Sequence, residues 1–141
     1  MFYRPTRVEI NTTALEGNYR QIRKLIGDDR HFCAVVKANA YGMGAPTIAR
    51  NLSRFGVDSF GVATLREAAE LRQAGVVKPI ILLGALYGSD SLWEALLLDL
   101  EISIHHLAAF DDIATIPSTM MIALMIMLIM SNLLNMKINL N

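Results

Sequence analysis

The sequence has little cysteine, no net charge and no apolar run in its first ten residues, and each shortage argues against a class of protein. A single cysteine among 141 residues excludes an internal disulfide framework and favours a reducing, cytoplasmic setting. Equal numbers of basic and acidic side chains, 13 of each, remove the electrostatic footprint that nucleic-acid binding needs. Met1 to Ile10 carries charged side chains and no apolar run, so we expect no secretory signal.

Several motifs that carry chemistry are also missing. The sequence has no zinc-ligand spacing, no Walker loop and no serine-nucleophile elbow, and we predict no metal site. His105 and His106 are adjacent, so on the strand predicted from Glu101 to His105 they would face opposite sides, which favours a structural role. His31 has no partner in sequence. Cys33 lies within an apolar run, where we expect an inert core thiol.

Charge is also missing from one end of the chain, which divides it into two parts. No charged residue lies between Ile113 and Met136, and six of the eight methionines lie between Met120 and Met136. We therefore predict a boundary near Ile113, with an ordinary domain over residues 1–113 and an apolar tail over 114–141.

Three interpretations of the tail stay open. A disrupted, frameshifted coding sequence would explain the simultaneous loss of charge and glycine. A membrane segment has the length of about 20 residues that a span needs, but Pro117 to Thr119 interrupt it, and the unbroken apolar run Met120–Met130 has only 11 residues. The third interpretation is a buried helix that covers the preceding domain. The sequence favours the first over the membrane segment.

The first part alternates strand and helix signals. Apolar strands begin near residues 32, 59, 80 and 101, with a short further strand candidate over Arg7–Ile10. Between them lie helix starts at the capping boxes Thr13–Glu16 and Thr64–Glu67, at Pro46, and at a cap from Ser89, Asp90 or Ser91. Such a repeat predicts an α/β fold with parallel strands, either an open doubly wound sheet or a (β/α)8 barrel.

Lys37 is the residue that points to chemistry. It follows the apolar run Phe32–Val36, so we place it at the carboxyl end of a strand, where α/β folds bind ligands. Desolvation there would favour the neutral amine that condenses with carbonyl groups. The alternative from the residues alone is a lysine that extends from a strand end into solvent.

The surrounding sequence supports the first alternative. Ala34 to Ala45, AVVKANAYGMGA, resembles the pyridoxal-phosphate attachment motif of the alanine racemases. Similar stretches include Glu9-Ile10, Phe60–Ala63, Glu67-Ala68, Leu71-Arg72, Gly75 and Lys78–Ile80. Met43 departs from the family, which usually has histidine there. The resemblance covers residues 1 to about 113 and implies about four βα units, the N-terminal portion of a (β/α)8 TIM-type barrel.

The resemblance also implies roles for residues. Lys37 would bind pyridoxal 5′-phosphate covalently and act as the base on one face of the substrate Cα. Tyr41 would contact the cofactor phosphate, and Leu83 would line the cofactor pocket. The implied activity is the interconversion of L-alanine and D-alanine, which supplies D-alanine for peptidoglycan, by a cytoplasmic homodimer.

The rest of the family's machinery has no counterpart in this sequence. The tail contains no tyrosine or arginine that could supply the second base or the residues facing the cofactor ring. We therefore predict that the chain alone does not racemise alanine at a useful rate. Two alternatives stay open, namely an inactive cofactor-binding remnant and a related barrel decarboxylase of amino acids. Half a barrel would leave two unpaired sheet edges, from which we predict poor solubility or self-association.

Overall fold

The fold is a parallel sheet with helices along one face. The computed structural model describes residues 8–106, 111 and 114. Its strands are β1 (Cys33–Val35), β2 (Ser59–Val62), β3 (Ile80–Leu82) and β4 (Leu100–Ile102), hydrogen-bonded in the order β1-β2-β3-β4, all parallel. The predicted α/β class and the four strand positions are confirmed. Residues 8–10 belong to no strand, so the strand predicted over Arg7–Ile10 is wrong for the part of it that the structure describes.

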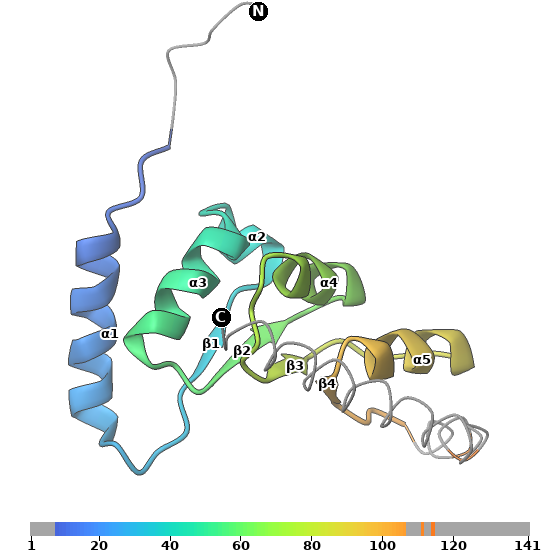
Figure 1. Cartoon of the computed structure of the whole chain (residues 1–141). Coiled ribbons are helices and arrows are strands. Elements are labelled where there is room, and N and C mark those ends of the chain that lie inside the picture. Colours follow the sequence, from blue (N-terminus) through green and yellow to red (C-terminus); the bar gives the residue numbers. More distant parts are fainter. Residues whose placement is uncertain (1–7, 107–110, 112–113, 115–141) are drawn as a thin grey trace, which may run out of the picture.

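One helix precedes β1, and the others connect each strand to the next. They are α1 (Thr12–Ile26), α2 (Lys37–Tyr41), α3 (Ala45–Phe55), α4 (Leu65–Gln73) and α5 (Ser89–Leu97). Figure 1 shows α3, α4 and α5 side by side along one face of the sheet, with α1 beside α3. The core lies between this helical layer and the sheet, and its largest fully buried side chains include Phe60, Leu71, Ile80 and Leu82.

The helix starts follow the predictions in part. Thr64 and Glu67 form the predicted capping box at the start of α4. The first helix instead begins after Asn11, whose side chain accepts a hydrogen bond from the amide of Ala14 at 2.9 Å, so the capping box predicted for Thr13–Glu16 is wrong. Asparagine caps a helix as well as threonine does, and Glu16 is used by an ion pair with Arg20.

The cap predicted for the last described helix is also wrong. Gly88 precedes α5 and no side chain caps it. The Ser91 hydroxyl, one of the predicted caps, instead donates to the carbonyl oxygens of Tyr87 and Gly88, at 2.7 and 2.9 Å. The strand predicted to reach His105 ends at Ile102, so the two histidines follow β4 rather than alternate along it.

The face of the sheet opposite the helices is less buried than the sequence predicts. The continuous apolar run that contains β1 predicts burial on both faces, but Val35 is 40% exposed and Cys33 is only half-buried. The reason is that no helix or strand within the described residues covers this face. Cys33 is therefore not the core thiol that we predicted. In the described part of the chain, β1 and β4 are unpaired on their outer sides.

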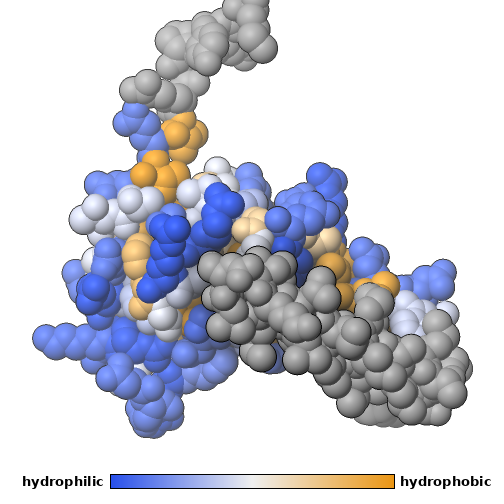
Figure 2. All heavy atoms as spheres, viewed as in Figure 1, coloured by the Kyte–Doolittle hydropathy of each residue, from blue (hydrophilic) through white to orange (hydrophobic). Residues whose placement is uncertain are grey.

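The surface of the described residues is mixed in polarity. Among the coloured residues, Figure 2 shows mainly hydrophilic ones, with hydrophobic residues in smaller patches. Within the part that the structure describes, no helix combines the length and the apolar character needed to cross a bilayer. The predicted boundary near Ile113 and all three interpretations of the tail fall outside the described residues, and they stay predictions.

Candidate functional site

Lys37 lies at the carboxyl edge of the sheet, as predicted. β1 ends at Val35, and the buried Val36 continues its pairing by donating its amide to the Gly61 carbonyl oxygen at 2.8 Å. Lys37 is the next residue, and its side chain is exposed. The desolvation that the sequence argument invoked is thus not present in this structure, whereas the position on the ligand-binding edge is.

The segment after Lys37 has an unusual backbone. Ala38, Asn39, Ala40 and Tyr41 all have positive φ angles, between 51° and 55°, so α2 is largely a left-handed turn. Each non-glycine residue in this conformation costs about 1–2 kcal/mol. Strain of this kind persists only where the surroundings hold it in place, and it gathers at functional sites.

Local hydrogen bonds hold this turn. The side-chain oxygen of Asn39 accepts from the amide of Ala45 at 2.8 Å, and its main-chain carbonyl oxygen accepts from the amide of Gly44 at 2.9 Å. Ala40 is 1% exposed and donates its amide to the Val36 carbonyl oxygen at 2.8 Å. The methyl group of Ala40 thus fixes the turn to the core, while its neighbours face outward.

The outward side of the turn is open. Tyr41, which the sequence predicts as a phosphate contact, is 61% exposed. Gly42 and Gly44 have φ angles of 86° and 91°, and a Cβ atom built on either would meet no atom within 4 Å. Both glycines satisfy a conformation that side chains disfavour, and they leave space at the surface beside Tyr41.

A carboxylate from α4, the helix that follows β2, contacts the left-handed turn. The half-buried Glu67 accepts the Ala38 amide on Oε1 at 2.7 Å, and on Oε2 it accepts the amides of Ala63 and Thr64 at 2.7 and 3.2 Å. Only the bond to Thr64 belongs to the predicted capping box. The contact with Ala38 spans 29 positions in the chain, and no signal in the sequence indicates it.

Leu83 lies at the same edge, directly after β3. Its amide donates to the Val62 carbonyl oxygen at 2.8 Å, and its side chain is 40% exposed. Its Cδ1 atom and the Cγ2 atom of Val35 both lie 3.3 Å from the point where Gly61 would carry a Cβ. The missing side chain of Gly61 therefore lets Leu83 approach the end of β1, two residues before Lys37.

A depression lies at this edge, on the helical side. Its volume is about 500 Å³, and its lining includes Ala63 and Thr64 after β2 and Ala85, Leu86 and Tyr87 after β3. His106 stacks on Tyr87 with ring centroids 5.2 Å apart, which agrees with the structural role predicted for this one of the two histidines. Among the described residues, no three His, Cys, Asp or Glu side chains are grouped as a metal site would require.

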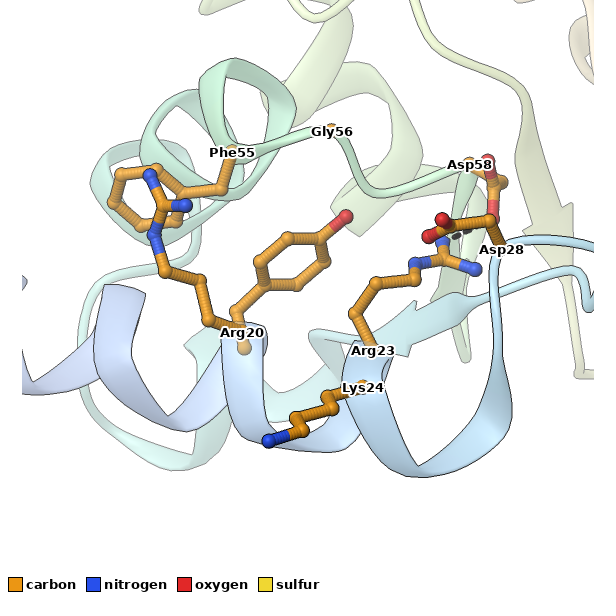
Figure 3. A pocket seen from close by; sticks show the side chains of 8 residues that line it. Arg20, Arg23, Lys24, Asp28, Phe55, Gly56 and Asp58 are labelled. Carbon is orange, nitrogen blue, oxygen red and sulfur yellow. Dashed lines mark hydrogen bonds and ion pairs between the residues drawn. The ribbon is translucent and has the colours of Figure 1, made fainter.

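The larger depression is at the opposite edge of the sheet. It has a volume of about 600 Å³ and lies between α1 and the segments that precede β1 and β2. Figure 3 shows Arg23 directed at Asp58, with Asp28 nearby and Lys24 directed away. Arg23 pairs with Asp58 at 2.6 Å and also donates to the carbonyl oxygens of Gly27 and Arg30.

These contacts make the larger depression a structural junction. The Arg23 guanidinium lies over the rings of Tyr19 and Phe32, at 6.0 and 5.4 Å from their centroids. Asp58 accepts the Phe32 amide at 2.6 Å, and this bond, followed by the bond from Arg23, lowers the pKa of the Asp58 carboxyl. His31 also has a partner here, because its Nε2 lies 2.8 Å from the Ser59 hydroxyl. Arg23 and Asp58 thus satisfy each other's charge. The amino edge of parallel strands is where α/β folds place stability rather than catalysis.

Comparison with known proteins agrees with the geometry. The family profile described as alanine racemase, N-terminal domain, matches residues 10–131. The alanine racemase of Geobacter sp. strain M21 is 38% identical over 116 residues, which cover 79% of this chain and 30% of that protein. Alanine racemase 1 of Caldanaerobacter subterraneus subsp. tengcongensis is 48% identical over 81 residues, 57% of this chain and 21% of that protein.

Solved structures give the same answer for the fold. The alanine racemase of Clostridium difficile 630 superposes with a TM-score of 0.74 at 33% identity, over 80% of this chain and 30% of that one. The alanine racemase from E. faecalis also gives a TM-score of 0.74 at 33% identity, over 79% of this chain and 30% of that one. The chain thus spans less than a third of each of these relatives, and its four-stranded sheet corresponds to the N-terminal part of their barrel. On the profile match and these similarities, the chain belongs to the alanine racemase N-terminal domain family.

Proposed function

We propose that this chain is the cofactor-attachment part of a pyridoxal-phosphate-dependent alanine racemase, with Lys37 as the attachment residue. The observation that carries the proposal is the position of Lys37. It is an exposed amine at the carboxyl edge of a parallel sheet, followed directly by a strained left-handed turn. Lys24 and Lys78, in contrast, lie at the end of α1 and just before β3, neither of them at the carboxyl edge.

The residues at this edge fit the chemistry of the cofactor. An exposed primary amine can condense with an aldehyde, and the exposed Tyr41 hydroxyl can donate to a phosphate oxygen. The half-exposed Leu83 supplies an apolar surface that an aromatic ring can contact. Open space around Gly42 and Gly44 leaves the backbone accessible to a ligand.

In this proposal each residue has a limited task. When bound, pyridoxal phosphate supplies the electron sink that lets a proton leave the substrate Cα. The Lys37 amine would hold the group in place and would carry the proton on one face of the substrate Cα. Tyr41 orients the phosphate end, and Leu83 limits the movement of the ring.

The proposal assigns a proton carrier to one face of the substrate Cα only. Racemisation needs a second proton carrier on the other face, and no residue of the described edge takes that role in our proposal. The named activity, its alanine substrate, a homodimer and a cytoplasmic location are expectations from the family, whose members are about three times longer than this chain. A remnant that binds the cofactor without turnover stays the alternative prediction.

The test is chemical trapping on the full 141-residue chain. The Lys37 amine should form a C=N bond with the aldehyde carbon of added pyridoxal phosphate, with loss of water. Borohydride then delivers hydride to that carbon and leaves a stable secondary amine, which peptide mass mapping can locate. We expect the label mainly on Lys37, with Lys24 and Lys78 as internal controls and Lys37→Arg as the matched variant. Equal labelling of the lysines would overturn the proposal.

A further inference from the structure

Glu67 connects two strand ends that are distant in sequence. One carboxylate oxygen accepts the amide of Ala38, which directly follows Lys37, and the other accepts the amides of Ala63 and Thr64 at the end of β2. With bonds of 2.7 Å to both sides, the side chain joins the β1 edge to the start of α4. A helix-capping role alone requires only the bond to Thr64.

The bond to Ala38 acts where the backbone is strained. Ala38 is the first of the four residues of the turn with positive φ, and among the described hydrogen bonds its amide is the one that links the turn to α4. The other bonds described for the turn connect it only to itself and to the segments on either side of it in the chain; their donors are the amides of Ala40, Gly42, Met43, Gly44 and Ala45. Glu67 is therefore the side chain that hydrogen-bonds the turn to the end of the neighbouring strand, in addition to the packing of Ala40 against the core.

We propose that Glu67 is a positioning residue that fixes the direction in which Lys37 leaves the sheet, in addition to its capping role. The inference rests on the proposed function of Lys37. Without the carboxylate, the Ala38 amide loses its acceptor and the left-handed turn can relax toward the more common backbone conformations. Lys37 and Tyr41, which lie at the two ends of the turn, would then no longer hold a fixed relation to each other.

Substitutions of Glu67 in the full chain test this role. Glutamine keeps the size of the side chain but has a single carbonyl oxygen, so it cannot accept on both sides. Aspartate keeps a negative charge in the first turn of α4, but its side chain is one methylene shorter, so it cannot bridge Ala38 and the end of β2. Glu70→Gln is the matched control, because it removes a carboxylate from the same helix that pairs only with Arg66, at 3.2 Å, among the contacts described.

The first readout is amide hydrogen exchange, which needs no cofactor. In Glu67→Gln and Glu67→Asp, we expect the Ala38 amide to exchange about tenfold faster or more, as loss of a bond to a charged acceptor requires. Amides within α1 should exchange at the rate of the parent chain. Glu70→Gln should leave the Ala38 amide unchanged. If Glu67→Gln does not fold, Glu67→Asp decides, because it retains the negative charge that stabilises the first turn of α4.

The second readout is the fraction of borohydride-trapped label on Lys37 relative to Lys24 and Lys78. We expect a decrease of about fivefold or more in both Glu67 variants and no change in Glu70→Gln. If the parent chain takes no label on Lys37, the proposed function fails, while the exchange of Ala38 still decides the role of Glu67. Unchanged Ala38 exchange in folded Glu67 variants, with only a lower melting temperature, would reduce Glu67 to a helix cap and overturn the inference.

Discussion

Replacing Gly84 with alanine tests how closely the ends of β2 and β3 approach each other at the candidate site. A Cβ atom built on Gly84 would lie 2.2 Å from the carbonyl oxygen of Ala63 and 3.4 Å from its carbon. The contact is with backbone, which cannot swing away as a flexible side chain would. The φ angle of Gly84 is not in the left-handed range, so the expected effect is purely steric.

The expected loss of stability follows from the movement of the two strand ends that the added methyl group requires. Relieving a contact of 2.2 Å requires the two strand ends to separate, and this strains the neighbouring bond from the Leu83 amide to the Val62 carbonyl oxygen, now 2.8 Å. Overpacking costs about 1–3 kcal/mol, and a weakened backbone hydrogen bond adds about 1 kcal/mol. We therefore expect Gly84→Ala to lower the free energy of unfolding by about 2–4 kcal/mol.

Urea unfolding of the full chain, followed by circular dichroism, measures this loss. The matched control is Gly17→Ala in α1, where an added Cβ would meet no atom within 4 Å. Alanine within a helix is more favourable than glycine by about 0.5–1 kcal/mol, so the control should be slightly more stable than the parent. A Gly84→Ala chain as stable as the parent would refute the close approach of the two strand ends.

Two further predictions concern the hydrogen bonds of Asp58 and Arg72, and a third concerns turnover of alanine. The Asp58 pKa is lowered from 3.8, first by the Phe32 amide and then by Arg23, so its stabilisation is full above that value and is lost as the pH falls through the folded-state pKa. The melting temperature of Asp58→Asn should therefore lie furthest below the parent near neutral pH, and the difference should close in strongly acidic buffer; a difference independent of pH would contradict this. Arg72 donates to four backbone carbonyl oxygens at 2.8–2.9 Å, so Arg72→Met should lose about 2–4 kcal/mol in urea unfolding, and a loss within experimental error would count against these bonds. The chain with pyridoxal phosphate and L-alanine should form no D-alanine at a useful rate by chiral chromatography, and rapid formation would show that a second proton carrier is present.

The sequence predicts the local elements well because their signals are local. An apolar run followed by Lys37 places the lysine at a strand end, and Thr64 with Glu67 three positions later predicts the start of α4, as observed. Where two residues can do the same task, the prediction is less secure. Asn11 and Thr13 are both good caps, and the structure uses Asn11.

The parts that sequence reasoning missed depend on contacts between distant segments. The bond from Ala38 to Glu67 exists only because parallel strands bring two successive strand ends together. The left-handed turn after Lys37 has a non-glycine residue at each of its four strained positions, so nothing in their types indicates positive φ. The exposure of Cys33 and Val35 depends on what covers the second face of the sheet, and an apolar run cannot report that.

The central claim is that Lys37, Tyr41 and Leu83 form one cofactor site at the carboxyl edge of the sheet. A crystal structure of the full chain after treatment with pyridoxal phosphate and borohydride tests it most directly. We predict continuous density from the Lys37 Nζ atom to the ring, the ring against Leu83, and the phosphate within hydrogen-bond distance of the Tyr41 hydroxyl. Density attached to Lys24 or Lys78, or a phosphate remote from Tyr41, would contradict the claim.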